Sequence, residues 1–277
     1  MSWYTQTDPR CYRGGYEAVQ RFNEAVLARR QKYPVSTEKN KEIVDNLLEK
    51  GYYVIENAFA REKVAKIRED FEKQLELGKN MKELNKHFAV IEQPLVHCPS
   101  IFDFAFDDRI VDIASEYFKC SPALGTFNLR RSYENLGAPV KHQIYHSDPN
   151  SIKFIKFFLY LEDVSLDNGP FTFVEDSLNN KFEGWTDKYR WTDEEMEQMY
   201  GKERVKRITA KVGDLIIANT TAFHKGTPPM KGDRTMLTLN YTIHPEEWNK
   251  PTYQIKQEDY DRLSDDKKPL ADFLVRI

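Results

Sequence analysis

The chain has 277 residues, with 41 lysines and arginines against 44 aspartates and glutamates, and a formal net charge of -3. This balance lacks the basic excess that attracts nucleic acids or anionic membranes, so we expect a small-molecule substrate and neither of those partners. No stretch approaches the roughly 18 apolar residues of a membrane span, and no secretion signal is visible. Cys11, Cys98 and Cys120 fit no disulfide or zinc pattern, which favours reduced thiols in a cytoplasmic protein.

The first part of the chain has the apolar spacing of helices. After an N-terminal extension over residues 1–40, apolar side chains recur every three or four positions through 36–50 and 60–84, which predicts two amphipathic helices. Between them, residues 51–59 are β-branched and aromatic, as is typical of a strand. A further helix is predicted over residues 101–118.

The chain changes character after about residue 122, where short apolar runs alternate with turn signals. Five strands are predicted, over residues 123–132, 153–163, 169–176, 207–219 and 234–245. A charged helical pattern at 185–204 indicates a helical insertion between strands, or a lid over the site, and residues 246–277 form a C-terminal extension. We therefore predict an α+β protein with a mainly β core, a sandwich or barrel behind a helical layer, as one domain over 1–277.

The segment KHQIYHSDPN, residues 141–150, contains two of the six histidines of the chain. On extended backbone, the side chains of His146 and Asp148 point to the same side because they are two positions apart. An imidazole and a carboxylate that converge in this way predict part of a metal site. H-x-D alone is common by chance, so the prediction depends on a third ligand.

The third ligand is supplied by the segment GDLIIANTTAFHKGTPP. His224 follows the apolar strand at 215–218 and precedes a glycine and two prolines that end regular structure. Arg234 then opens the strand RTMLTLNYTI. Alternation places Arg234 on the mixed face of that strand, which we expect to line a cavity, while the apolar face packs on the helices.

These residues resemble the phytanoyl-CoA dioxygenase-like family of Fe(II)- and 2-oxoglutarate-dependent oxygenases. The H-x-D motif, the later histidine and the arginine after it are similar to that family's pattern, as are LLEKGYYVIENAFAREKVAKIRED and LYLEDVSLDNGPFTFVEDS. The resemblance covers about residues 40–245 and implies a double-stranded β-helix, or cupin-like jelly-roll. The chain departs from the family at EDSLNN, where a Pro-Gly-Ser-His run is frequent.

The resemblance implies an iron site formed by His146, Asp148 and His224. Two histidines and one carboxylate leave three positions of an octahedral ion open, as non-haem Fe(II) oxygenases require. In the family these positions serve 2-oxoglutarate and O2, and an arginine that matches Arg234 holds the distal carboxylate of 2-oxoglutarate. The implied reaction releases succinate and CO2.

Retention of Asp148 favours hydroxylation of an unactivated C–H bond. Related halogenases replace this carboxylate with a small residue so that chloride can bind the iron. Desaturation and cyclisation use the same oxidant and stay open. The substrate is expected to be a small free metabolite, and the protein a monomer or a homodimer.

Five further residues are weaker candidates. Asn128 and Arg130 share the polar face of their strand, which we expect to lie beside the H-x-D strand. Asn128 would then contact 2-oxoglutarate and Arg130 an acidic substrate, unless the strand is an ordinary edge strand. Thr172 is a candidate neighbour of the cosubstrate, while Gln143 and Tyr145 either line the substrate side or point outward.

Two other classes of protein fit some of these residues. A metal enzyme on a cupin-like barrel that does not use 2-oxoglutarate would keep the three ligands but would not need Arg234. A catalytically idle relative would bind a ligand without turning it over. Retention of all three ligand types argues against the idle relative.

Overall fold

The computed structural model describes residues 24, 27–29, 39–84, 86–135, 137–148, 153–243 and 253–277. Most of the predicted N-terminal extension, with Cys11, lies outside these ranges, as does His244. No helix in the described ranges is long and apolar enough to cross a membrane.

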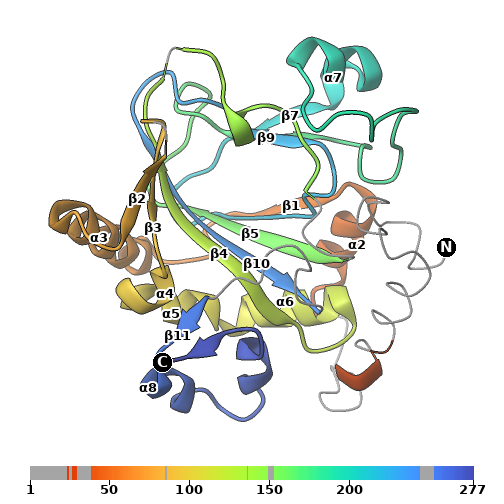
Figure 1. The fold of residues 1–277 in the computed structure, drawn as a ribbon. Coiled ribbons are helices and arrows are strands. Elements are labelled where there is room, and N and C mark those ends of the chain that lie inside the picture. Colours follow the sequence, from red (N-terminus) through yellow and green to blue (C-terminus); the bar gives the residue numbers. More distant parts are fainter. Residues whose placement is uncertain are drawn as a thin grey trace.

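A seven-stranded antiparallel sheet, the major sheet, forms the centre of the molecule (Figure 1). Its strands, in spatial order, are β1 (Tyr52–Ile55), β8 (Leu215–Ala218), β5 (Phe154–Tyr160), β10 (Arg234–Thr242), β4 (Ala123–Ser132), β3 (Phe88–Ile91) and β2 (Met81–Leu84). The predicted strand over 123–132 matches β4 residue for residue. The long strands β4, β5 and β10 lie side by side and set the register of the whole sheet.

Helices cover one face of the major sheet. They are α2 (Lys41–Glu49), α3 (Arg61–Leu77), the short α4 (Pro94–His97) and α5 (Phe102–Ala105), and α6 (Asp108–Phe118). Their buried side chains, such as Leu47, Ile67 and Ile113, form one core with Leu237 and Leu239 of β10. The predicted apolar face of β10 therefore does pack on the helical layer.

A smaller sheet faces the other side of the major sheet. It consists of β7 (Val205–Ile208), β6 (Phe171–Val174) and β9 (His224–Gly226). Single antiparallel bridges extend it, including one between His146 and His224. Two antiparallel sheets packed face to face in this way form a jelly-roll, and the space between them holds the site.

The predicted insertion lies between β6 and β7. Its helix α7 (Asp193–Tyr200) begins at Thr192, whose side chain accepts from the Glu195 N–H while the Glu195 carboxylate accepts from the Thr192 N–H. Met196 of α7 is fully buried against an aromatic cluster that includes Trp191 and Phe223. The helix is thus fastened to the outside of the smaller sheet.

The C-terminal extension contains β11 (Gln254–Ile255), α8 (Gln257–Asp261) and β12 (Val275–Arg276). Strands β11 and β12 pair in parallel. Ile255 and Leu270 are buried in the core beneath the helices, so this extension completes the helical layer.

Two predicted helices are wrong in part. The helix predicted over 60–84 ends at Leu77, because Gly78 takes the left-handed conformation that stops helices, and β2 follows. The helix predicted over 101–118 is broken at Asp107, which is extended and caps α6 by accepting from the Arg109 N–H. Both breaks depend on single residues within otherwise periodic sequence.

The predicted neighbour of β4 is also wrong. Strand β4 pairs with β10 and β3, whereas His146 pairs with His224 in the smaller sheet. The polar face of β4 nevertheless looks toward the site, because it forms the opposite wall of the same jelly-roll.

Candidate metal centre

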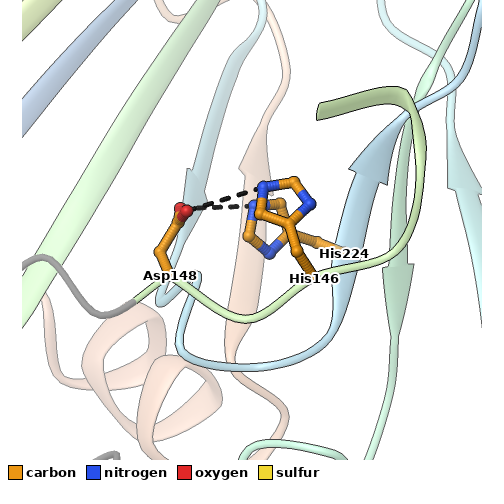
Figure 2. A group of neighbouring side chains, drawn as sticks. All are labelled: His146, Asp148 and His224. Carbon is orange, nitrogen blue, oxygen red and sulfur yellow. Dashed lines mark ion pairs between the residues drawn. The ribbon is translucent and has the colours of Figure 1, made fainter. Parts of the chain in front are cut away.

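His146, Asp148 and His224 come together at one end of the space between the two sheets (Figure 2). The backbone N–H of each histidine donates to the carbonyl of the other at 3.0 Å. This bridge sets the two imidazoles side by side, with ring centroids 4.3 Å apart. Asp148 is fixed next to them because its N–H donates to the Thr220 carbonyl at 2.9 Å.

The donor atoms of the three side chains all lie within 4.8 Å of one another. Nε2 of His146 is 3.5 Å from Asp148 Oδ1, and Nε2 of His224 is 3.3 Å from Asp148 Oδ2. Among the described residues, no other group of three such side chains converges in this way. A single ion could therefore take one ligand atom from each residue.

Backbone carbonyls fix the orientation of both imidazoles. Nδ1 of His146 lies 2.9 Å from the Ile144 carbonyl, and Nδ1 of His224 lies 3.0 Å from the Ala222 carbonyl. A carbonyl can only accept, so each Nδ1 carries the proton and each Nε2 presents its lone pair to the cluster. Metal-binding histidines use this arrangement because it locks both tautomer and ring direction.

The protonation states suit a metal site. Burial, together with the neighbouring His224, holds the pKa of His146 well below its usual range. Burial alone would raise the pKa of Asp148, but the neighbouring positive charge, above all the Lys156 ammonium, outweighs it, and that pKa lies well below its usual range. A neutral imidazole and a charged carboxylate are the forms that bind metals.

Asp148 has two further partners that sequence reasoning missed. Lys156 Nζ donates to Asp148 Oδ2 at 2.6 Å, and Thr220 Oγ1 donates to the same oxygen at 2.7 Å. The available signal was weak: Lys156 is a lone charge at an inward position of β5, between Phe154 and Phe158. The sequence alone does not show that Asp148 is the partner of this lysine, because only the fold places Asp148 next to β5.

A cavity of about 180 Å³ opens at the cluster. Its walls are mostly inward-facing residues of β4, β5 and β10, with residues of β6 and β9 opposite. The lining residues are Thr126, Phe127, Asn128, Arg130, His142, His146, Asp148, Lys156, Phe158, Phe171, His224, Gly226, Met236, Thr238 and Tyr253. Met236 and Thr238 lie on the mixed face of β10 that was expected to line a cavity, whereas Lys156, Phe158, Phe171 and Tyr253 are among the lining residues that sequence reasoning did not single out.

Arg234 is buried next to this cavity, with only 2% of its surface exposed. Its guanidinium donates to the Gly169 carbonyl and, at 3.1 Å, to Ser132 Oγ. Nε has no hydrogen-bond partner within the described residues. A carboxylate against that edge would satisfy this donor, so the residue fits the terminal carboxylate of a cosubstrate.

Gly226 separates the guanidinium from the cavity. A Cβ at this position would lie 3.2 Å from Nη2 of Arg234. The absence of a side chain at Gly226 therefore keeps space beside the guanidinium at the cavity wall.

The structure brings Asn128 and Arg130 to the cavity, as predicted for the polar face of β4. Asn128 Oδ1 is buried and lacks a partner within the part of the chain that the structure describes. Arg130 lies over the Phe88 ring, with its guanidinium carbon 5.1 Å from the centroid. His142 also lines the cavity, and its ring centroid is 5.4 Å from that of His146.

Three predicted site residues do not reach the cavity. Thr172 is buried on the opposite side of β6 from Phe171 and lies 2.7 Å from Thr227 Oγ1. Tyr145 points outward into the aromatic cluster under α7. Gln143 is buried, with Oε1 accepting from the Val140 N–H. Adjacent side chains on a strand point to opposite faces, so a shift of one residue in the sequence exchanges a side chain that faces the site for one that points away from it.

A jelly-roll with two histidines and one carboxylate at the end of its cavity defines a class of mononuclear metal proteins. The family model for phytanoyl-CoA dioxygenase matches residues 47–234. The chain belongs to this family, as its sequence motifs predicted. A comparison with curated protein sequences found no match to this chain.

Solved structures confirm the predicted jelly-roll. The carbocyclase SnoK from nogalamycin biosynthesis is 15% identical with a TM-score of 0.59, over 75% of this chain and 84% of that one. HygX from Streptomyces hygroscopicus, with nickel and 2-oxoglutarate bound, is also 15% identical with a TM-score of 0.59, over 80% and 92%. EctD from S. alaskensis is 16% identical with a TM-score of 0.56, over 76% and 78%.

Proposed function

We propose that the protein is an Fe(II)- and 2-oxoglutarate-dependent oxygenase that hydroxylates an unactivated C–H bond of a small metabolite. One observation carries the proposal: His146, Asp148 and His224 converge while Arg234, in the adjoining wall, keeps a buried donor without a partner. A metal site alone would not need the arginine. HygX, which shares the fold, binds nickel and 2-oxoglutarate.

His146, Asp148 and His224 would hold the iron. The imidazoles offer Nε2 because their Nδ1 protons are already used by backbone carbonyls. Oδ2 of Asp148 accepts from Lys156 and Thr220, which favours coordination through one carboxylate oxygen. Three ligands from one side leave room on the ion for 2-oxoglutarate and O2.

Arg234 would hold the distal carboxylate of 2-oxoglutarate. The Gly169 carbonyl and Ser132 Oγ fix the plane of its guanidinium, so the unpaired Nε edge stays in place for a charged acceptor. Asn128 Oδ1 and Thr238 on the same wall are further polar groups at the cavity.

When bound, iron with 2-oxoglutarate would supply the activation of O2: 2-oxoglutarate is oxidised to succinate and CO2, and the second oxygen atom of O2 serves to oxidise a C–H bond of the substrate. The chain contributes the enclosure for that chemistry. Phe158, Phe171 and Met236 form apolar surface at the cluster, which limits access of water to reactive species.

Hydroxylation is favoured because Asp148 occupies the position that a halide would need. The fold also carries other outcomes: the similar structures include a carbocyclase and an epimerase. Product analysis with isotopically labelled O2 would separate them, since hydroxylation alone places labelled oxygen in the product.

Anaerobic titration tests the proposal. Fe(II) and then 2-oxoglutarate are added to the purified protein, and formation of the weak visible charge-transfer band is recorded. Wild type should form the band, and Arg234→Gln should need about 10- to 100-fold more 2-oxoglutarate, because a charge-assisted pair is lost.

The matched control is Arg131→Gln, which removes a guanidinium from the other face of β4. Arg131 is paired with Glu72 and Thr235 and touches no part of the cavity. Its titration should match wild type. If the wild-type protein binds Fe(II) but gives no band, a metal enzyme without 2-oxoglutarate becomes the better description.

A further inference from the structure

We infer that the cavity binds a substrate bearing an oxyanion, a carboxylate or a phosphate, and that Arg130 holds this group. The inference rests on the proposed function and adds a substrate class to it. Three observations support it: the guanidinium of Arg130 forms no ion pair among the described residues, positive charges outnumber negative ones at the cavity, and Arg234 occupies a separate position.

Arg130 forms no ion pair with another side chain in the part of the chain that the structure describes. It lines the cavity, and among the described residues no hydrogen bond or ion pair reaches its guanidinium. Its guanidinium lies over the face of the Phe88 ring, and the charges of Arg234 and Asp148 are near enough to act on it, although no hydrogen bond or ion pair joins either of them to Arg130. Burial and the nearby Arg234 lower the pKa of Arg130 to about 10, which still leaves it charged at neutral pH. A planar guanidinium in this state suits a bidentate oxyanion.

The adjacent residue shows what a structural arginine looks like in the same strand. Arg131 points to the opposite face of β4, where its guanidinium donates to both oxygens of Glu72 and to Thr235 Oγ1. Arg131 is therefore fully engaged within the fold, and Arg130 is not. The difference follows from strand alternation, which turns one arginine to the helices and the other to the site.

Charge at the site also calls for an anion. Arg130, Lys156 and Arg234 lie at or beside the cavity. Among the described residues, Asp148 is the one acid in its lining, and Glu162 lies near Arg234 outside the lining, so cations still outnumber acids. Ferrous iron and dianionic 2-oxoglutarate would cancel one another, so the cationic excess would persist in the loaded site. Charge that is removed from water is costly unless it is paired, and an anionic substrate supplies that pairing.

The two arginines serve different positions along the wall. Arg234 is opposite Ser132 on β4, whereas Arg130 is opposite Met236, two residues further along β10. Arg234 is anchored to Gly169 and Ser132, and Arg130 is anchored to neither. The apolar surface of Phe158, Phe171 and Met236 would then contact the uncharged part of the substrate.

Calorimetric titration with inorganic phosphate and with acetate tests the inference without identifying the substrate. Wild type, Arg130→Gln and Arg131→Gln are compared in the metal-free state and in the anaerobic state with Fe(II) and 2-oxoglutarate. We expect wild type and Arg131→Gln to bind at least one of the two anions equally well. Arg130→Gln should bind it about 10- to 100-fold more weakly. The anion that binds wild type more tightly indicates whether the substrate group is a phosphate or a carboxylate.

Phosphate and acetate that bind wild type and Arg130→Gln equally, or that fail to bind wild type, would overturn the inference. The charge-transfer band is recorded on the same samples. Arg130→Gln should form it at the wild-type concentration of 2-oxoglutarate; loss of the band would assign Arg130 to the cosubstrate instead. Because the metal-free titration needs neither iron nor 2-oxoglutarate, a wild-type protein without the band would refute the proposed function and leave the anion result readable.

Discussion

Lys156 donates to the carboxylate of Asp148 at 2.6 Å, and both side chains are largely buried, with 15% and 13% of their surfaces exposed. Lys156 lies in β5 of the major sheet, and Asp148 lies just after the bridge that joins His146 to His224 in the smaller sheet. This pair therefore ties the two sheets together at the point where a metal would bind.

A double-mutant cycle measures that connection. In metal-free protein, Asp148→Asn and Lys156→Met should be coupled by about 1 to 3 kcal/mol, because either change alone leaves a buried charge without its partner. Urea denaturation in the presence of a chelator gives the four free energies of unfolding.

The exposed pair of Lys41 and Asp45 on α2 is the matched control. Their side chains are 64% and 55% exposed, so water and salt screen the interaction. Their coupling should be no more than about 0.5 kcal/mol. Equal coupling in the two cycles would mean that burial does not strengthen the Lys156 pair.

Metal affinity should separate three histidines that lie close together. His146→Ala and His224→Ala should weaken Fe(II) or Co(II) binding by at least about 100-fold, because each variant lacks a metal ligand. The loss of a residue that only hydrogen-bonds to a ligand usually has a smaller effect. His142→Ala should change it by less than about tenfold, since that ring lies near His146 outside the cluster. Equilibrium titration under anaerobic conditions provides the measurement, and a large loss in His142→Ala would require a different ligand set.

Much of the fold was predictable because single strands carry their own alternation. In β10, the apolar set with Leu237 and Leu239 packs on the helices and the mixed set with Arg234 and Thr238 faces the site, as the pattern indicated. The three converging ligands were also predictable, since residue type and order were sufficient to recognise the family.

Other parts of the site depend on contacts that no single strand encodes. The run Phe171–Val174 is buried on both faces, so its pattern could not show that Phe171, rather than Thr172, faces the cavity. Tyr145 precedes a ligand by one residue and for that reason points away from the cavity. The contact between Lys156 and Asp148 joins β5 to the segment that follows the His146 bridge, so no pattern within a single strand could show it.

Lys153 should make stability depend on pH. Only 7% of this residue is exposed, its Nζ lies 3.4 Å from the Tyr117 carbonyl, and burial lowers its pKa from 10.5 to about 7. Between these two values the unfolded chain binds more protons than the folded one, so the contribution of Lys153 to stability is complete above pH 10.5 and falls as the pH drops toward 7.

Replacement of this lysine should therefore stabilise the protein at neutral pH. Lys153→Met should raise the free energy of unfolding by about 1 to 3 kcal/mol near pH 7, with the difference from wild type shrinking toward pH 10. Chemical denaturation at several pH values measures it. Lys66→Met, at an exposed position of α3, should show no such trend; a constant difference for Lys153→Met would contradict the lowered pKa.

Gly169 links the Asn-Gly turn before β6 to the position of Arg234. Its φ is +84°, and a Cβ there would lie 2.5 Å from the Thr227 carbonyl oxygen, while its own carbonyl accepts from the Arg234 guanidinium. Gly169→Ala must move this backbone, so we expect a loss of about 2 kcal/mol or more in unfolding free energy. Weaker 2-oxoglutarate binding should accompany it, because Arg234 loses its anchor.

Gly232→Ala separates backbone strain from this specific effect. Gly232 also has a positive φ, +76°, but a Cβ there would meet no atom within 4 Å. Gly232→Ala should lower the free energy of unfolding by only about 1 kcal/mol and keep wild-type 2-oxoglutarate binding, because the left-handed backbone conformation is the one source of strain there. Denaturation curves and the anaerobic titration, run on both variants, give the comparison. Equal 2-oxoglutarate affinity in the two variants would show that the Gly169 carbonyl does not position Arg234.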